Sequence, residues 1–414
     1  MSILTDANAI IHESIQAVLP DAAVRRALSN VQFNGGITVV AIGKAAWRMA
    51  KTAADTLGDR IRACLIVTKY EHSEGSIERF EIIEAGHPIP DANSILGARK
   101  ALELVSDFTD RDDVLFLVSG GGSALFELPL PGVTLEDMQA LTKCLLASGA
   151  DIAQINTIRK HLSAVKGGRF AQACSPAHIH AVILSDVLGD SLDAIASGPA
   201  VPDTSTSADA FSILELYGIP LTDPMSNAIM HETPKALHNV DTQITGNVSQ
   251  LCEAASIAAQ RLGYTPLILT TTLDCEAREA GAFLAAIARE IHGTGRPVKP
   301  PCAVILGGET VVHLRGSGKG GRNQELALAA AKGIDGLPNV ALFSVGSDGT
   351  DGPTDAAGGI VTGDFAVQCR AAGLSIDAYL SNNDSYNILK AMNSLIIIGP
   401  TGTNVNDLTV LMIG

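Results

Sequence analysis

The stretch "GSGKGGRNQE", residues 316–325, carries four glycines, a lysine and an arginine directly before the alanine-rich run "LALAAAK". Glycine and cations at the start of an expected helix are typical of loops that bind phosphate through backbone N–H groups. The stretch does not match the Walker A pattern, because Lys319 is followed by Gly320 and His313 stands where the first glycine belongs. It therefore indicates an anion site without identifying the anion.

Two other segments place glycine and polar residues at the ends of apolar runs. In "VVAIGKAAWRMA", Lys44 follows Gly43 at the start of an expected helix, which favours a bound phosphate or carboxylate about as much as a solvated lysine. In "LVSGGGSALFELP", three consecutive glycines expose the backbone to close approach of a ligand. The predicted binding residues of this second segment are Ser119, Gly120, Gly121, Gly122 and Ser123.

The segment "NTIRKHLSAVKGGRFA" concentrates cations in an otherwise acidic chain. Arg159 and Lys166 are seven residues apart, so we expect them on the same face of one helix if the helix extends that far. Most such runs are basic, solvated helix faces, but a local cationic patch also favours a small anion. Arg159 and Lys160 are therefore candidate substrate- or nucleotide-binding residues.

Carboxylates follow several of the expected strands. Asp186 in "ILSDVLGD" stands at the end of an apolar run beside a glycine-containing turn, which suits Mg²⁺. Glu309 in "VILGGET" precedes Arg322 by a few residues, so a carboxylate and a guanidinium are expected close together. Asp351 lies in the loop "SVGSDGTDGPTDAAGG", where a functional role and ordinary acidic turn chemistry are equally favoured. The predicted metal ligands are Asp186, Glu309 and Asp351.

Short apolar runs ending in glycine or serine alternate with helical patterns, which predicts a mostly parallel sheet covered on both faces. The runs are residues 37–43, 63–69, 113–122, 180–186, 302–308 and 340–349. A chain of 414 residues with 46% apolar residues can fill two cores. Residues 202–245 break the rhythm before an expected helix at 247–262, so we predict an α/β protein with domains at 1–240 and 241–414.

Composition excludes several classes of partner. A net charge of −15 and a pI near 5.0 argue against nucleic acid and anionic membranes. Seven cysteines without a CxxC pair suit reduced thiols in the cytoplasm. No signal peptide is evident, and no apolar run reaches the roughly 18 residues of a membrane span. The dinucleotide fingerprint GxGxxG follows none of the expected strands, which counts against NAD.

Taken together, the segments resemble the class II glycerate kinases, whose C-terminal half is the MOFRL domain. The matching stretches cover nearly the whole chain and are "GKAA", "HPIPD", "SGGGSAL", "RKHLSAVKGG", "SDVLGD…IASGP", "GGET", "GGRNQE", "GSDGTDGPTDAAGG" and "GPTGTNVNDL". The resemblance implies two α/β domains, a Rossmann-like N-terminal one and a smaller mixed C-terminal one, with the active site in the cleft. It implies phosphorylation of D-glycerate by ATP to give 2-phosphoglycerate.

The resemblance also implies functional roles for Lys44, Asp186, Glu309, Arg322 and Asn404. The glycine loop around Arg322 adds Gly320, Gly321 and Asn323 as binding candidates. Phosphoryl transfer needs positioning and neutralisation of charge, which fits cations, glycines and Mg²⁺ ligands without a covalent nucleophile. An NAD(P)H-dependent hydroxypyruvate reductase and a non-catalytic organic-acid-binding protein remain alternatives, and a homodimer is one open possibility for the assembly.

Overall fold

The computed structural model describes residues 2–414 and divides the chain into two compact units. One unit consists of Ala23–Thr245 and is called the parallel-sheet unit. The other joins the N-terminal segment up to Ala22 to Gly246–Gly414 and is called the mixed-sheet unit. Among residues 2–414, no helix combines the length and apolar character that crossing a membrane requires.

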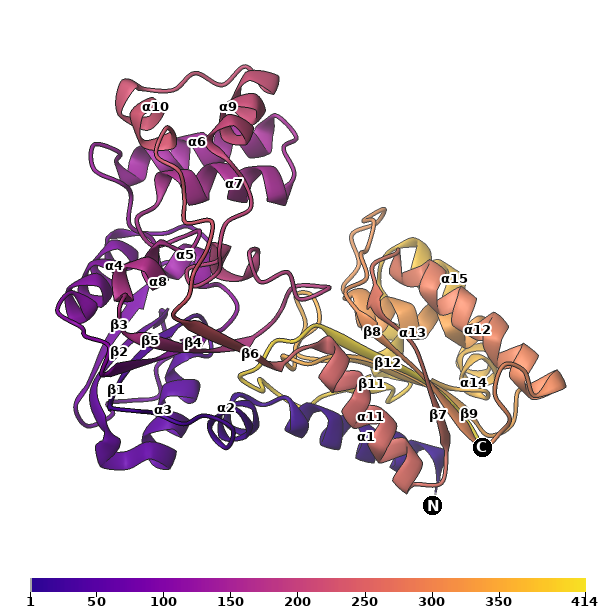
Figure 1. Ribbon diagram of the computed structural model, residues 1–414. Helices are drawn as coiled ribbons and strands as arrows, with labels where there is room; N and C mark the ends of the chain where they lie inside the picture. The colour runs from indigo at the N-terminus through magenta and orange to yellow at the C-terminus, as the bar shows by residue number, and fades with distance from the viewer. Residues whose placement is uncertain (1) are drawn as a thin grey trace. The chain divides into compact units, whose positions relative to one another are not determined.

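The parallel-sheet unit is built on a six-stranded sheet with the order β3-β2-β1-β4-β5-β6, within the described residues (Figure 1). β1 pairs in parallel with β2 and β4, β2 with β3, and β4 with β5. The strands are β1 (Gly36–Ile42), β2 (Ile61–Lys69), β3 (Phe80–Ala85), β4 (Asp112–Val118), β5 (His178–Leu184) and β6 (Val240–Gly246). The predicted parallel sheet is confirmed, and its central strands are buried on both faces.

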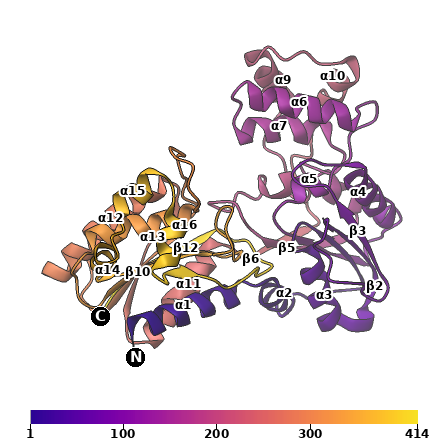
Figure 2. The ribbon, with the colours of Figure 1, turned by 180° about the vertical axis from the view of Figure 1, so that it is seen from behind.

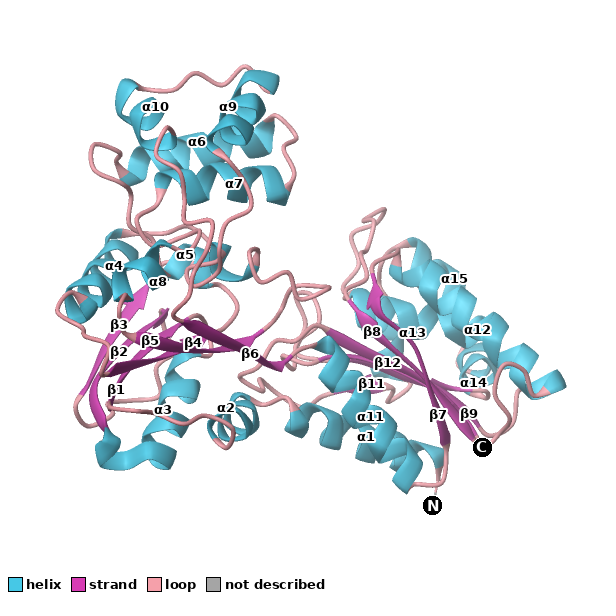
Figure 3. Ribbon diagram, in the orientation of Figure 1, coloured by secondary structure: helices cyan, strands magenta, loops and turns pink. Residues whose placement is uncertain are grey.

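Alternate residues of these strands enter two separate cores, as the period of two in a strand requires. Val39 and Leu117 pack with α3 on one face, whereas Val40 and Phe116 pack with α4 and α8 on the other. Figure 3 shows helices beside this sheet. The helices are α2 (Pro20–Leu28), α3 (Ala46–Leu57), α4 (Ala92–Val105), α5 (Gly122–Leu125) and α8 (Arg169–Cys174), with short 3₁₀ turns at Gly58–Arg60 and Ile195–Ser197.

Four further helices of this unit form their own small apolar core, with Leu141, Leu145, Ile158 and Leu214 among its members. They are α6 (Leu135–Ala147), α7 (Ile152–Leu162), α9 (Ser207–Leu216) and α10 (Asp223–Ile229), grouped together in Figure 1. Three of the four begin with capping boxes, in which the side chain before the helix and the third helical residue satisfy each other's backbone N–H groups.

The mixed-sheet unit has a six-stranded sheet, within residues 2–414, of order β11-β10-β9-β12-β8-β7. Figure 2 shows β10 and β12 of this sheet from behind. Only the β7–β8 pair among these strands is parallel. The strands are β7 (Thr265–Leu273), β8 (Cys302–Gly308), β9 (Val340–Gly346), β10 (Gly358–Thr362), β11 (Leu395–Ile396) and β12 (Asp407–Ile413). The helices are α1 (Ile3–Ala17), α11 (Val248–Arg261), α12 (Ala277–Thr294), α13 (Arg322–Gly333), α14 (Phe365–Ala371), α15 (Ile376–Ser381) and α16 (Ser385–Ala391).

The N-terminal helix α1 does not belong to the unit in which the predicted boundary of 1–240 placed it. Its buried residues include Ala7, Ile10 and Ile11, and the helix packs against α11 of the mixed-sheet unit. Tyr264 donates a 2.9 Å hydrogen bond to Asp6, and Thr403 donates a 3.0 Å hydrogen bond to the carbonyl of Val18. The predicted boundary at 240 falls five residues before the change of unit at 245, whereas the assignment of the first 22 residues is corrected.

Candidate active site

In the parallel-sheet unit, the loops that follow β1 and β4 are locked together by backbone contacts. The N–H of Lys44 donates to the carbonyl of Gly120 at 2.9 Å, and the N–H of Ala45 donates to Oγ of Ser119 at 3.1 Å. The N–H of Ser119 donates in turn to Ile42 at 3.0 Å. The structure therefore brings the two sequence-predicted segments around Lys44 and Ser119 side by side at the carboxyl ends of adjacent strands, where ligands of such sheets bind.

The side chains of His87 and Lys44 pack against Gly121, which has no side chain of its own. Its φ of +84° lies in the left-handed region, and a methyl group there would lie 3.0 Å from Cδ2 of His87 and 3.3 Å from Cε of Lys44. Burial and the charge of Lys44 lower the pKa of His87 from 6.5 to about 4, so the imidazole is neutral at pH 7. His87 was not among the predicted site residues, although it begins the motif "HPIPD".

Asp186 follows β5 and reaches the same glycine run. A methyl group at Gly120 would lie 2.2 Å from Oδ2 of Asp186, so only glycine leaves room for the carboxylate there. Asp186 is half-buried, and a carboxylate in this position fits Mg²⁺, which takes few protein ligands and keeps room for phosphate oxygens. Ser123, at the other end of the run, lies 2.5 Å from Ser197, oxygen to oxygen.

Two cations of the basic segment donate hydrogen bonds to the last residue of the glycine run. Nη2 of Arg159 and Nζ of Lys166 each donate to the carbonyl of Ser123 at 2.8 Å, and Lys166 also donates to Phe126 at 2.9 Å. The condition for placing both cations on one helix face is not met, because α7 ends at Leu162. Lys166 is fully buried, and burial lowers its pKa from 10.5 to about 8 despite the nearby carboxylate of Glu127.

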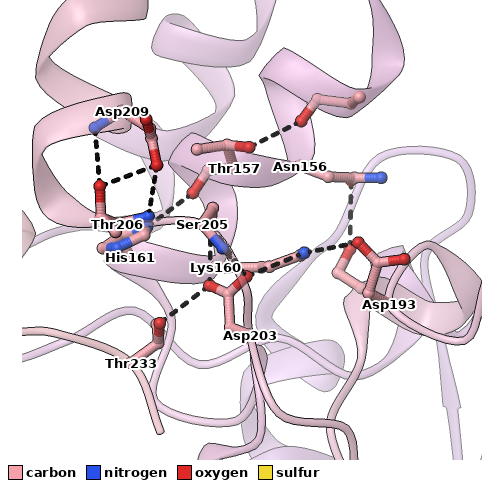
Figure 4. Close-up of polar contacts among 12 residues, drawn as sticks. Asn156, Thr157, Lys160, His161, Asp193, Asp203, Ser205, Thr206, Asp209 and Thr233 are labelled. Atoms are coloured by element: carbon pink, nitrogen blue, oxygen red, sulfur yellow. Dashed lines mark hydrogen bonds and ion pairs between the residues drawn. The ribbon is translucent and has the colours of Figure 1, made fainter. Parts of the chain in front are cut away.

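Lys160 lies apart from the glycine run, in a buried polar cluster (Figure 4). Its ammonium is 3.1 Å from Asp193 and 3.2 Å from Asp203, whose side chain is fully buried. Thr233 donates a further hydrogen bond to Asp203 at 2.9 Å. Because two carboxylates already neutralise Lys160, we interpret it as a structural cation that anchors α7, in place of the predicted ligand-binding role.

In the mixed-sheet unit, Arg322 occupies the first position of α13 and is held by two carboxylates. Nε and Nη2 donate to the two oxygens of Asp407 at 2.5 and 3.1 Å, and Nη1 donates to Glu309 at 2.8 Å. Burial acts to lower the pKa of Arg322, but the contacts with Asp407 and Glu309 outweigh it and raise the pKa above its usual value. The guanidinium is therefore permanently charged.

Asp407 was not among the predicted site residues, although it lies in the stretch "GPTGTNVNDL" that carries the resemblance. It begins β12 and pairs in register with Gly346 of β9 and Gly308 of β8, so it stands at the centre of the sheet's edge. A carboxylate directly before the apolar run "LTVLMI" was the available signal, because a carboxylate at the start of a buried strand needs a cationic partner. Glu309 follows the adjacent strand β8, as predicted.

Asp351 caps the helix that begins with Arg322. Its carboxylate accepts hydrogen bonds from the backbone N–H groups of Asn323 and Gln324 at 3.2 and 2.9 Å, and from the side chain of Gln324 at 3.0 Å. Burial raises the pKa of Asp351 to about 6, although these donors act in the opposite direction. A buried carboxylate satisfied in this way suits a helix cap, so we assign Asp351 that role in place of the predicted metal ligand.

The glycine loop before Arg322 is filled by its own chain. The backbone N–H groups of Arg315, Ser317 and Lys319 donate to the side chains of Asn383, Asn382 and Asp384 at 2.7, 3.2 and 3.0 Å. A methyl group at Gly320 would lie 2.2 Å from Oγ of Ser385, and one at Gly321 would meet the carboxylate of Asp351 at 2.3 Å. The loop therefore uses its glycines to pack tightly, and its N–H groups at these positions are already occupied.

Asn404 lies close in sequence to Asp407 and orders the same turn. Its Oδ1 accepts the backbone N–H of Asn406 at 3.3 Å. Asn406 is buried with φ of +67°, and its Nδ2 has no hydrogen-bond partner within residues 2–414. Asn323, also predicted, is buried beneath Arg322 and accepts a 2.6 Å hydrogen bond from Ser344. A binding role for Asn404 stays a prediction.

The chain combines a parallel-sheet α/β unit with a mixed-sheet α/β unit, and each unit has charged side chains at the ends of its strands. Comparison with known proteins identifies the class of protein that shares this architecture. Residues 6–230 match a family model described as a domain of unknown function (DUF4147), and residues 302–407 match the MOFRL family. The D-glycerate 2-kinase of Thermotoga maritima is 57% identical over 98% of this chain and 97% of its own length.

Two further relatives extend the comparison. A crystal structure of glycerate kinase from Thermotoga maritima matches with a TM-score of 0.97 and 56% identity, over 99% of both chains. A putative hydroxypyruvate reductase of Agrobacterium vitis is 42% identical over 92% of this chain and 88% of its own length. The chain belongs to the glycerate 2-kinase family.

Proposed function

We propose that this protein is a glycerate 2-kinase, which transfers the γ-phosphoryl group of ATP to the 2-hydroxyl of D-glycerate and releases ADP. The observation that carries the proposal is the 57% identity, along almost the whole of both chains, to a protein named D-glycerate 2-kinase. The two charged sites supply what phosphoryl transfer requires, namely fixed cations and tightly positioned backbone.

In the parallel-sheet unit, we propose that Lys44 contacts a phosphate oxygen from its position over Gly121. The imidazole of His87 beside it is neutral, so it adds no second positive charge at this contact. The glycine run from Ser119 to Ser123 lets a ligand approach the backbone, and Arg159 and Lys166 fix its far end through the carbonyl of Ser123.

In the mixed-sheet unit, we propose that Arg322 stabilises the charge of the transferring group. Three of the five N–H groups of a guanidinium are used by Asp407 and Glu309, which leaves one on each terminal nitrogen. Two adjacent N–H groups can bind two oxygens of one phosphoryl group, a geometry that a lysine does not offer. Asp407 therefore acts as the support that aims the free edge of Arg322.

Mg²⁺ is part of the proposal, with Asp186 as the protein ligand that fits it best. The ion would neutralise the phosphate charge of ATP beside the glycine run. Glu309 is 45% exposed at its side chain but pairs with Arg322, which makes it a weaker candidate than Asp186. We propose a cytoplasmic location, supported by seven cysteines that are all unpaired in the described chain.

Two observations make an NAD(P)H-dependent reductase the alternative that the experiment must test. The order β3-β2-β1-β4-β5-β6 is that of dinucleotide-binding sheets, and relatives carry the name putative hydroxypyruvate reductase. However, the turn after β1 reads "GKAAWR" instead of GxGxxG, so Ala45 and Arg48 stand where the fingerprint has its second and third glycines. Strand order alone does not define function.

The experiment incubates the protein with ATP, Mg²⁺ and D-glycerate and identifies the product by phosphorus NMR. We expect the resonance of 2-phosphoglycerate together with ADP. Oxidation of NADH or NADPH with hydroxypyruvate at a comparable rate would overturn the proposal in favour of a reductase. Binding of D-glycerate without any turnover would instead support an acid-binding protein.

A further inference from the structure

A cluster of metal-ligating side chains lies at the amino end of the parallel sheet. His178 and His180 stand two residues apart on β5, so both imidazoles project from the same face. Asp241 is the second residue of β6, and the hydrogen bond from Ile179 to Asn239 at 2.7 Å places the beginnings of β5 and β6 together. One ligand atom of each of the three residues lies within 4.8 Å of the other two.

We propose that His178, His180 and Asp241 form a binding site for a divalent transition-metal ion, with Zn²⁺ as the best match. Nε2 of His178 is 2.9 Å from Oδ2 of Asp241. With metal–ligand bonds of about 2.0–2.2 Å, ligand atoms of a tetrahedral site are about 3.3–3.6 Å apart, so small side-chain rotations close the site. Two imidazoles and one carboxylate select zinc and its neighbours over Mg²⁺ or Ca²⁺, which prefer oxygen ligands.

The burial of His180 is an independent observation in favour of a ligand. His180 is only 8% exposed, and its Nε2 has no hydrogen-bond partner within residues 2–414. The nearest carboxylate to this atom, Oδ1 of Asp113, is 3.5 Å away. Asp113 is itself held by the backbone N–H groups of Asn34 and Gly35 at 2.6 and 2.8 Å. These donors hold the carboxylate of Asp113 in place without a hydrogen bond to His180, so Nε2 of His180 remains available to a metal ion.

The exposure of the other two side chains gives the ion a route from solvent. The side chain of His178 is 34% exposed and that of Asp241 is 72% exposed, so both can rotate onto an ion and the fourth position stays open to water. Asp186 and the glycine run lie at the carboxyl ends of the same sheet. A metal at the amino ends therefore does not compete with the phosphoryl-transfer site.

Bound metal should stabilise the unit, because it links β5 to the edge strand β6. An ion that binds the folded chain and not the unfolded chain raises the melting temperature with concentration. The test uses protein that has been treated with a chelator and freed of it, in the absence of ATP, which would itself bind the ion. Titration with ZnCl₂ by calorimetry should show one site, and thermal melting should shift upward.

Paired variants make the assignment specific. His178→Ala and Asp241→Asn should each weaken Zn²⁺ binding by ~10-fold or more and remove the thermal shift. His292→Ala, at an exposed position of α12, should bind like the wild type. The exposed thiols of Cys144 and Cys275 are the competing ligands, so the double variant Cys144→Ser, Cys275→Ser should keep the site. Unchanged affinity in His178→Ala, or loss of binding in the cysteine variant, would overturn the assignment.

Discussion

Replacing Arg322 by lysine is expected to remove most of the activity while the protein stays folded. The guanidinium makes two hydrogen bonds to Asp407 and one to Glu309, so these carboxylates use three of its five N–H groups. We propose that the other two bind a phosphoryl group. Lysine is a single point charge that cannot bridge a carboxylate and a phosphoryl group in the same way. If the contact strengthens in the transition state, as the proposal requires, kcat should fall by ~10³-fold, with a smaller change in the KM for D-glycerate.

The supporting carboxylates should produce a graded series of effects. Asp407→Asn keeps one acceptor but removes the charge-assisted pair, and a hydrogen bond to a charged group is worth about 1.5–3 kcal/mol. If that energy aims Arg322, kcat should fall by ~10- to 100-fold. The side chain of Glu309 is 45% exposed, so Glu309→Gln should cost less than ~10-fold, since exposed ion pairs contribute little.

The assay is coupled ADP release at saturating ATP and varied D-glycerate, with the fold checked by circular dichroism and thermal melting. Arg315→Lys is the matched control, because this arginine is 60% exposed and its nearest carboxylate, Glu276, is 3.7 Å away. Turnover of Arg322→Lys within ten-fold of the wild type would refute a transition-state role for Arg322. Strict multiplicativity of the Arg322→Lys and Asp407→Asn losses would refute the support by Asp407, because partners in contact are expected to couple.

Three further predictions follow from the parallel-sheet unit. Asp186→Asn should lower kcat at saturating ATP and raise the Mg²⁺ concentration for half-maximal activity, and an unchanged Mg²⁺ profile would make Asp186 a turn residue only. Lys160→Met should cost about 3–5 kcal/mol of unfolding free energy in denaturant titrations, because it leaves the buried Asp203 unpaired. The pKa of Lys166 falls from 10.5 to about 8 on folding, so the unfolded chain binds the proton more tightly than the folded chain. The free energy of unfolding should therefore be lowest below pH 8 and should rise as the pH increases from 8 to 10.5. Relative to Lys166→Met, the wild type should gain up to about 1.4 kcal/mol per pH unit in that window, and parallel profiles would contradict the shift.

The strands and the paired glycine and cation segments were predictable because their signals are local. Six apolar runs correspond to β1, β2, β4, β5, β8 and β9, and the predicted helix at 247–262 corresponds to α11 with Asn247 as its cap. Strands buried on both faces need apolar runs whether their neighbours are parallel or antiparallel, so the runs locate the strands, although β9 is antiparallel to both of its neighbours. The segments of Lys44 and Ser119 lie side by side because they follow β1 and β4, which are neighbouring parallel strands whose carboxyl ends lie at the same edge of the sheet.

Partners distant in the sequence were not predictable. The apolar face of α1 shows that the helix is buried, but not that it packs against α11. The most buried carboxylates that hold Arg322 and Lys160, Asp407 and Asp203, come from residues more than 40 positions away. The charge of a lysine in a sequence does not reveal whether water, a ligand or a buried carboxylate neutralises it. Burial decides that question, and burial is a property of the assembled fold.

The glycine loop before α13 also has partners that the sequence does not reveal, in this case partners of its backbone. Glycine indicates that something approaches the chain closely, but a ligand and another part of the protein leave the same signal. At residues 315–319 the approaching group is the segment 382–384, whose side-chain oxygens accept the N–H groups that a phosphate would otherwise use. Arg322, one turn further on, donates three of its N–H groups to Asp407 and Glu309. If Arg322 binds the transferring group, as we propose, the loop serves to position this arginine and the side chain of Arg322 binds the anion.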